Sequence, residues 1–193
     1  DDPAVIERLR RAANLFADSL QRAAEVPGKS AARHIPTARI NQGLCFQAAG
    51  EWKGARESYA SFLKLHPDHK LATRIRFSLA GACVELNEME DAQQHYSQAA
   101  AGAGAQEQDL AVRALLQASV ILRRLERPKD AIPLLKDAVG RAGKLQGNDA
   151  ETARLVVDAG YQHSVALIES GAGEEALGAL STYLESFPGS RNE

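Results

Sequence analysis

Residues 43–67 have the sequence GLCFQAAGEWKGARESYASFLKLHP, and this stretch decides the fold. Apolar residues recur every three or four positions on both sides of Ala49-Gly50-Glu51-Trp52, which predicts two amphipathic helices joined by a tight turn. Helices joined in this way approach closely only where neither presents bulk at the crossing. We therefore expect Gly43 and Ala55 to mark the crossing of the two helices, and Pro67 to end the second helix.

The same pattern recurs three more times along the chain. The small residue of the second helix is repeated at Ala55, Ala92, Ala131 and Ala176. The small residue of the first helix lies twelve positions earlier each time, at Gly43, Ala80, Ser119 and Ser164. Such repetition is typical of helical repeats, in which each helix pair packs on the next. The pattern predicts helices near residues 3–25, 31–49, 53–65, 69–86, 89–102, 107–126, 128–142, 148–170 and 173–186.

The spacing of these residues resembles that of the tetratricopeptide repeat (TPR). The residues that carry the resemblance are Gly43, Phe46, Ala55, Tyr59 and Pro67, echoed in the next unit by Ala80, Cys83, Ala92 and Tyr96. The resemblance implies an all-α, right-handed α-solenoid of antiparallel helix pairs, with a concave groove lined by the first helix of each pair. We expect the repeats at residues 31–68, 69–106, 107–147 and 148–190. They exceed the family's usual length of about 34 residues, so extra turns or loops are expected around 102–108 and 143–150.

The whole chain, residues 1–193, is expected to form a single domain that belongs to a longer polypeptide. Its first helix resembles the second half of a preceding repeat, because Ala12 and Phe16 reproduce the spacing of Ala55 and Tyr59. The closing residues 183–190 are similar to the ends of repeats in bacterial cell-envelope proteins of the family. This similarity favours the periplasm or cell envelope over the cytoplasm, although the sequence leaves the compartment open.

The composition argues against several kinds of partner. The formal net charge is −2 and the pI is about 6.3, so nucleic acid is not an expected partner. No apolar run is long enough to span a bilayer, so no membrane insertion is expected. The basic cluster Glu7-Arg8-Leu9-Arg10-Arg11 is expected to be a solvated face, because Glu7, Asp18 and Glu25 interrupt it.

Cys45 and Cys83 are expected to be buried free thiols, because both lie within helical apolar patterns.

No motif for catalysis, phosphate binding or a redox pair occurs, so the sequence predicts no enzyme and no cofactor. The only segment with closely spaced metal-ligand types is His66-Pro67-Asp68-His69. We interpret it as a loop between repeats, with Pro67 ending one helix and Asp68 as the N-cap of the next, and we predict no metal site.

The predicted function is a protein-interaction scaffold that binds a peptide or protein in the groove. The groove mixes polar and apolar side chains, which suits an extended or helical peptide. The predicted binding residues are Asn41, Gln47, Arg74, Phe77, Ser78, Arg113, Gln117, Arg123, Tyr161 and Gln162. The arginines could favour an acidic segment of the partner. The alternative is a self-associating or spacer module within a larger cell-envelope or multidomain protein, with a homo-oligomer among its expected assemblies.

Overall fold

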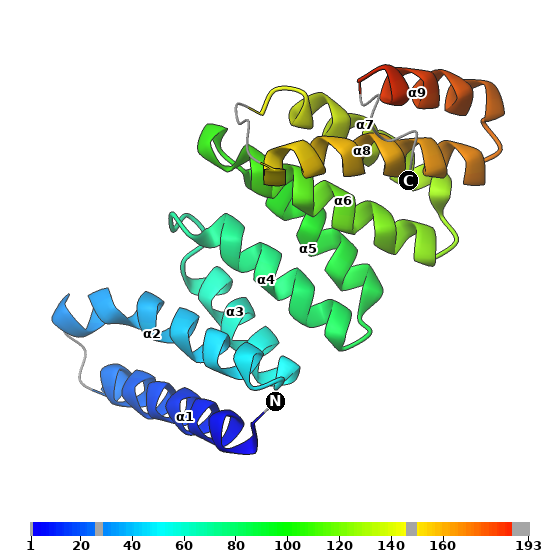
Figure 1. Ribbon diagram of the computed structural model, residues 1–193. Coiled ribbons are helices and arrows are strands. Elements are labelled where there is room, and N and C mark those ends of the chain that lie inside the picture. Colours follow the sequence, from blue (N-terminus) through cyan, green and yellow to red (C-terminus); the bar gives the residue numbers. More distant parts are fainter. Residues whose placement is uncertain (1, 26–28, 146–149, 187–193) are drawn as a thin grey trace. The chain divides into compact units, whose positions relative to one another are not determined.

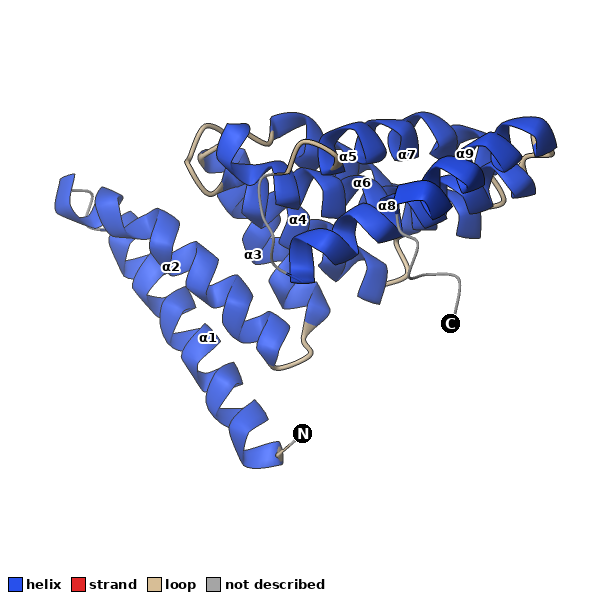
Figure 2. Ribbon diagram, turned by 45° about the horizontal axis from the view of Figure 1, so that its top comes forward, coloured by secondary structure: helices blue, strands red, loops and turns tan. Residues whose placement is uncertain are grey.

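The structure is a computed structural model that describes residues 2–25, 29–145 and 150–186. These residues form nine α-helices and one short 3-10 helix, with no strand among them (Figures 1 and 2). The helices are α1 (Pro3–Glu25), α2 (Lys29–Ala48), α3 (Trp52–Leu65), α4 (Ala72–Glu85), α5 (Met89–Gly102), α6 (Gln108–Arg124), α7 (Pro128–Ala142), α8 (Ala150–Glu169) and α9 (Gly173–Ser186). The prediction of an all-α helical repeat is confirmed.

The chain divides into two compact units, residues 1–95 and 96–193, and the division falls within α5. In unit 1, α1 packs on α2, α2 on α3 and α3 on α4. In unit 2, α6 packs on α7, α7 on α8 and α8 on α9, and α6 also contacts α8. Within each unit, these helices therefore pack on their neighbours in the chain, as expected of helical hairpins arranged in series.

The small residues at the predicted crossings are buried. This holds for Gly43, Ala55, Ala80, Ala92, Ser119, Ala131, Ser164 and Ala176. The closest approach is in the first repeat, where an added Cβ at Gly43 would lie 2.4 Å from Cε1 of Tyr59. Tyr59 is completely buried, and its hydroxyl donates a 2.7 Å hydrogen bond to Oε1 of Gln47. A tyrosine on the second helix thus fills the space that the glycine leaves on the first.

Two predictions about helix boundaries need correction. Helix α4 begins at Ala72 instead of near residue 69, and its N-cap is Leu71, with no capping side chain. The prediction of Asp68 as N-cap is therefore wrong, because an additional turn separates it from the helix. In this turn the backbone N–H of Leu71 donates to Nδ1 of His69, and the His69 ring packs edge-on against Phe62.

The extra loop predicted around 102–108 contains the 3-10 helix η1 (Ala105–Glu107). Of the loop predicted around 143–150, residues 146–149 lie outside the described residues. Pro128 occupies the first turn of α7, as predicted. Pro36, in contrast, lies inside α2, which begins before it at Lys29.

The same capping geometry recurs at the turn inside each of the four repeats. One residue there has a positive φ: Gly50 (72°), Asn87 (60°), Glu126 (58°) or Gly171 (83°). The next residue donates its N–H to the carbonyl five positions back, as from Glu51 to Phe46 at 2.8 Å and from Arg127 to Leu122 at 2.9 Å. This is a Schellman motif, in which the left-handed residue follows the last helical turn. Each first helix therefore ends in the same way, whichever residue occupies the position.

Because the positive φ recurs, introducing a glycine at this turn position and replacing one there are expected to change the stability of the fold in opposite directions. Glu126→Gly is expected to stabilise the fold by about 0.5–1 kcal/mol, because the left-handed region strains any residue with a Cβ. Gly171→Ala is expected to destabilise it by about 1 kcal/mol, although its Cβ would meet no atom within 4 Å. Urea unfolding followed by circular dichroism would measure both. Equal stabilities of the two variants would contradict the assignment.

Candidate binding surface

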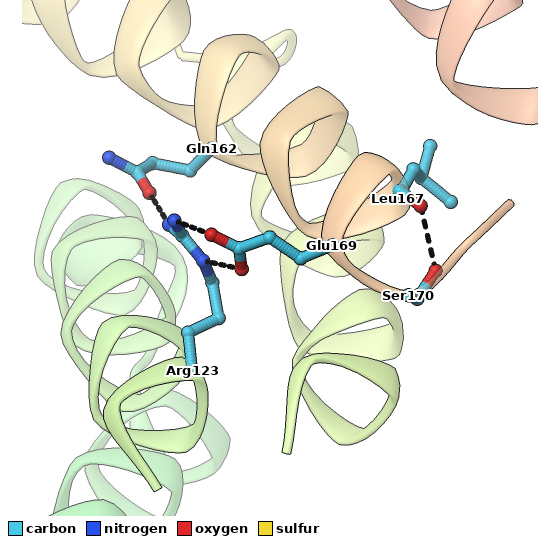
Figure 3. Close-up of polar contacts among 5 residues, drawn as sticks. All are labelled: Arg123, Gln162, Leu167, Glu169 and Ser170. Carbon is cyan, nitrogen blue, oxygen red and sulfur yellow. Dashed lines mark hydrogen bonds and ion pairs between the residues drawn. The ribbon is translucent and has the colours of Figure 1, made fainter. Parts of the chain in front are cut away.

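Arg123 joins the first helices of the last two repeats. Its guanidinium extends from α6 to α8, where Nε lies 2.6 Å from Oε2 of Glu169 and Nη2 lies 2.7 Å from Oε1 (Figure 3). Its Nη1 donates to Oε1 of Gln162, which lies two helical turns before Glu169 on α8. Two parallel N–H bonds to one carboxylate fix both the distance and the orientation of the two side chains. The contact therefore sets how α6 and α8 lie against each other.

The electrostatics of this pair agree with its geometry. Hydrogen bonding to Arg123 lowers the pKa of the Glu169 carboxyl below its ordinary value of 4.5, although partial burial acts in the opposite direction. Hydrogen bonding to Glu169 correspondingly raises the pKa of Arg123 above its ordinary value, again against the effect of burial. Both side chains are thus stabilised in their charged forms.

We expect the pair to contribute to stability only while Glu169 is ionised. Because the folded-state pKa lies below the unfolded value near 4.5, the contribution is fully present above about pH 4.5 and is lost as pH falls through the folded value. Glu169→Gln is expected to cost roughly 0.5–1 kcal/mol at neutral pH, since the pair is partly exposed, and almost nothing in strong acid. Urea unfolding at both pH values, with Glu57→Gln on the exposed face of α3 as control, would test this. An unchanged cost in acid would argue against the ion pair.

Arg113 makes a second contact of this kind at the other end of α6. Its Nη2 donates to Oε1 of Glu151 in the first turn of α8. Two of the arginines predicted to bind a partner are therefore already engaged by carboxylates of the chain. An acidic partner would have to compete with Glu151 and Glu169 for them.

Two of the predicted glutamines also have partners within the chain. Gln162 accepts the bond from Arg123, and Gln47 accepts the bond from the hydroxyl of Tyr59. Both are half-buried. These amides orient neighbouring side chains, and their place in a binding surface stays a prediction.

The remaining predicted residues lie on the first helices with different exposures. In unit 1, Asn41 on α2 and Phe77 and Ser78 on α4 are half-buried, whereas Arg74 is exposed. In unit 2, Gln117 on α6 and Tyr161 on α8 are exposed. The structure brings Arg123 and Gln162 into contact. Arg74 and Ser78 on α4, and Arg113 and Gln117 on α6, lie four positions apart and so share a side of their own helix.

Exposed neighbours of these residues complete the face of α6. Gln117, Val120 and Arg124 lie three and four positions apart, so they share one side of the helix. Gln117 and Arg124 are exposed and Val120 is half-buried. On α2, the position equivalent to Val120 holds the exposed apolar residue Leu44. The α6 face offers an amide, an apolar side chain and a guanidinium within two helical turns.

The comparison with known protein families identifies the repeat. A family model described as tetratricopeptide repeat matches residues 37–69, which include the crossing of Gly43 with Tyr59. Residues 37–69 are similar to a tetratricopeptide repeat. The matched segment is the first of the four predicted repeats, and it extends from α2 to the turn before α4.

Several solved structures are similar to this fold. Nearly identical TPR-like repeats of a kinesin light chain-like protein from Podosopora anserina match with a TM-score of 0.65 and 14% identity, covering 98% of this chain and 96% of theirs. BtubC (BKLC) from P. vanneervenii matches with a TM-score of 0.69 and 14% identity, covering 96% and 76%. The ArsTM double mutant of MamA from RS-1 matches with a TM-score of 0.59 and 16% identity, covering 94% and 98%. A search of curated protein sequences finds no match.

These similarities concern the fold alone, since all three identities are low. TPR arrays are generally interaction scaffolds and not enzymes. Within the described residues, every helix is too short or too polar to cross a membrane. The described His, Cys, Asp and Glu side chains do not form any group of three that could hold a metal ion.

The two thiols of the chain are free and differ in exposure. Cys83 is buried, and burial together with nearby Glu88 raises its pKa to about 11. Cys45 is half-buried rather than fully buried as predicted, and burial also raises its pKa. The thiolate is the reactive form of cysteine, so the raised pKa of both thiols opposes reactivity near neutral pH.

Proposed function

We propose that the first helices of the TPR repeats present the binding faces for a peptide or protein partner, and that the chain is a non-catalytic scaffold. The observation that carries this proposal is the α6 face formed by Gln117, Val120 and Arg124. Arg113, four residues before Gln117 on the same side of α6, and Arg123 are engaged by α8, while Gln117 and Arg124 are exposed. The α6 face therefore combines a rigid support with side chains that remain exposed to a partner.

The chemistry of the α6 face indicates the kind of peptide that it suits. An apolar side chain of the partner can cover Val120, while Gln117 offers both a donor and an acceptor to backbone groups. Arg124 can bind one carboxylate or carbonyl. A partner with one apolar anchor and few acidic residues fits better than a strongly acidic one, because Arg113 and Arg123 already bind carboxylates of the chain.

Selection from a random peptide display library would test this proposal. Val120→Ser combined with Gln117→Ala is expected to weaken the selected peptide about tenfold in calorimetric titration, since a few central residues dominate such interfaces. The matched control is Val139→Ser on the second helix α7, where Val139 is exposed and lines a cavity of about 380 Å³. Loss of binding in the Val139 variant, with binding retained in the α6 variant, would place the site elsewhere and refute the proposal.

The alternative, a self-associating or spacer module within a larger protein, is a second proposal. It is favoured by exposed apolar side chains on α8 and α9, away from the α6 face. Light scattering over a concentration series separates the two functions, because a peptide-binding scaffold needs no second copy. A strictly monomeric chain would exclude self-association and leave peptide binding untouched.

A further inference from the structure

A cavity of about 380 Å³ lies between α7, α8 and α9 of unit 2. Its walls include Val139 of α7, Val156, Gly160 and His163 of α8, and Ala179 and Tyr183 of α9. Binding sites for small molecules commonly have volumes of about 300–1,000 Å³, with mostly apolar walls and a few polar groups. The cavity therefore has the size and the lining of such a site.

The preceding repeat has small residues at two of these positions. With Ala131 aligned with Ala176, Val156 and His163 correspond to Ala111 and Ala118 of α6. Both of these alanines are completely buried, whereas Val156 and His163 are only half-buried. Unit 2 thus closes these positions with alanine in one repeat and surrounds a cavity with larger side chains in the next.

The ring of Tyr183 forms one wall of the cavity and packs on Gly160. An added Cβ at Gly160 would lie 2.8 Å from Cδ2 of Tyr183. The preceding repeat has the opposite arrangement, with Leu115 on the first helix and Ala138 on the second, 3% and 0% exposed. In the last repeat the bulky residue is therefore on the second helix. Its flat aromatic ring can stack on another ring or meet the edge of one.

The cavity lies on a different side of α8 from the one that a following repeat would contact. Arg113 and Arg123 of α6 bind the following repeat, and they correspond to Asp158 and Ile168 of α8. These two residues lie five positions before and after His163, about 140° around the helix from it at 3.6 residues per turn. A helix packed on α8 as α8 packs on α6 therefore leaves the cavity open.

The imidazole of His163 is a neutral polar group at the cavity. Burial lowers the pKa of His163 below its ordinary value of 6.5, and Lys136 on α7 acts in the same direction, whereas Glu175 on α9 raises it. The ring therefore carries one N–H donor and one acceptor nitrogen at neutral pH. A neutral imidazole can donate to a hydroxyl group or accept from it, but it lacks the charge that would attract a carboxylate.

We propose that the cavity binds a small uncharged aromatic molecule that carries one hydroxyl group. The aromatic body lies against Tyr183 and contacts Val139 and Val156, and the hydroxyl bonds to a ring nitrogen of His163. A cavity of about 150 Å³ is enough to hold benzene, so two fused rings fit here. Thr182, also at the cavity, already donates its hydroxyl proton to the carbonyl of Gly178 at 3.0 Å. This site is separate from the α6 face that is proposed to bind a peptide.

Calorimetric titration with β-naphthol would test the proposal. The wild-type chain is expected to bind one molecule with a dissociation constant on the order of 100 µM. β-Naphthoate, in which a carboxylate replaces the hydroxyl, is expected to bind at least tenfold more weakly. Heteronuclear NMR spectra would locate the site without any substitution, because the ring signals of His163 and Tyr183 are expected to shift while those of the buried Tyr59 in unit 1 stay in place.

Two substitutions in the cavity separate its volume from its polar group. Ala179→Leu fills part of the space and is expected to weaken β-naphthol binding at least tenfold. Ala60→Leu, at an exposed alanine of α3, adds the same atoms elsewhere and is expected to have no effect. His163→Leu is expected to weaken binding about fivefold, the effect of one lost hydrogen bond. His163→Gln keeps a donor and an acceptor, so it is expected to bind about as tightly as the wild type.

The α6 variant with Val120→Ser and Gln117→Ala is expected to bind β-naphthol like the wild type. Loss of peptide binding in that variant would leave the cavity untouched, so either proposal can fail alone.

Three outcomes would overturn the proposal. The first is a wild-type chain that shows no saturable binding of β-naphthol up to millimolar concentrations. The second is a folded Ala179→Leu variant, checked by circular dichroism, that binds as tightly as the wild type, or ring signals of His163 and Tyr183 that do not move. The third is β-naphthoate that binds more tightly than β-naphthol, or a His163→Leu variant with unchanged affinity, because either result would mean that the imidazole does not select a hydroxyl group.

Discussion

Gly43→Ala is expected to lower the free energy of unfolding by about 2–3 kcal/mol, the upper part of the range for overpacked cores. The added Cβ would lie 2.4 Å from Cε1 and 2.7 Å from Cδ1 of Tyr59. The ring has little freedom to move away, because it is completely buried and its hydroxyl is bonded to Gln47. The two helices must therefore separate, or the tyrosine must leave its rotamer.

Gly140→Ala is the matched control for this substitution. Gly140 is an exposed residue of α7, and its added Cβ would meet no atom within 4 Å. This variant is expected to be more stable than the wild type by up to about 1 kcal/mol, because alanine favours the helix over glycine. Urea unfolding can be followed by circular dichroism and by the fluorescence of the single tryptophan, Trp52 in α3. Equal stabilities of the two variants would show that the crossing tolerates bulk at residue 43.

A second substitution can show whether the Tyr59 ring is the cause. Gly43→Ala with Tyr59→Leu is expected to cost less than the sum of the two single changes, because the smaller side chain removes the clash. Unit 2 already combines a larger residue on the first helix with leucine on the second, as in Ser119 with Leu135. Strict additivity would indicate that the alanine acts through another contact.

The helix crossings could be predicted from sequence because their signal is local and repeated. Each pair of small residues is separated by the same interval, and each lies within an apolar pattern with helical spacing. The Schellman turns were harder to predict. Gly50 and Gly171 are typical of a left-handed residue, but Asn87 and Glu126 adopt the same conformation without being glycine. At Asn87 and Glu126 the repeat determines the left-handed backbone conformation, so the residue type does not predict it.

The candidate surface could be predicted only in part. Helical spacing indicated that Arg113 and Arg123 share a side of their helix, but their partners Glu151 and Glu169 lie on a later repeat. Nothing in the local pattern identifies which carboxylate packs opposite which arginine. The prediction of Asp68 as an N-cap was wrong for a similar reason. Nδ1 of His69 accepts a hydrogen bond from the N–H of Leu71, and the helix begins later, at Ala72.

Leu135→Ala is expected to destabilise the fold by about 2–5 kcal/mol, the range for a leucine removed from a packed core. Leu135 is completely buried on α7, four residues after the crossing residue Ala131. The cavity should persist, because its neighbours along the same side of the helix, Ala131 and Ala138, are already small and completely buried.

The matched control for the leucine is Leu177→Ala on α9, the second helix of the next repeat. It removes the same atoms from a side chain that is largely exposed, so the change in stability is expected to stay within about 0.5 kcal/mol. Urea unfolding monitored by circular dichroism compares the two at equal protein concentration. That concentration should be low, because Leu177 is among the exposed apolar side chains on α8 and α9 that favour self-association, and association would add to apparent stability. A similar loss of stability in both variants would mean that Leu177 is buried in solution, either by the chain itself or by a second copy. Dilution separates these two cases, because only burial by a second copy depends on protein concentration.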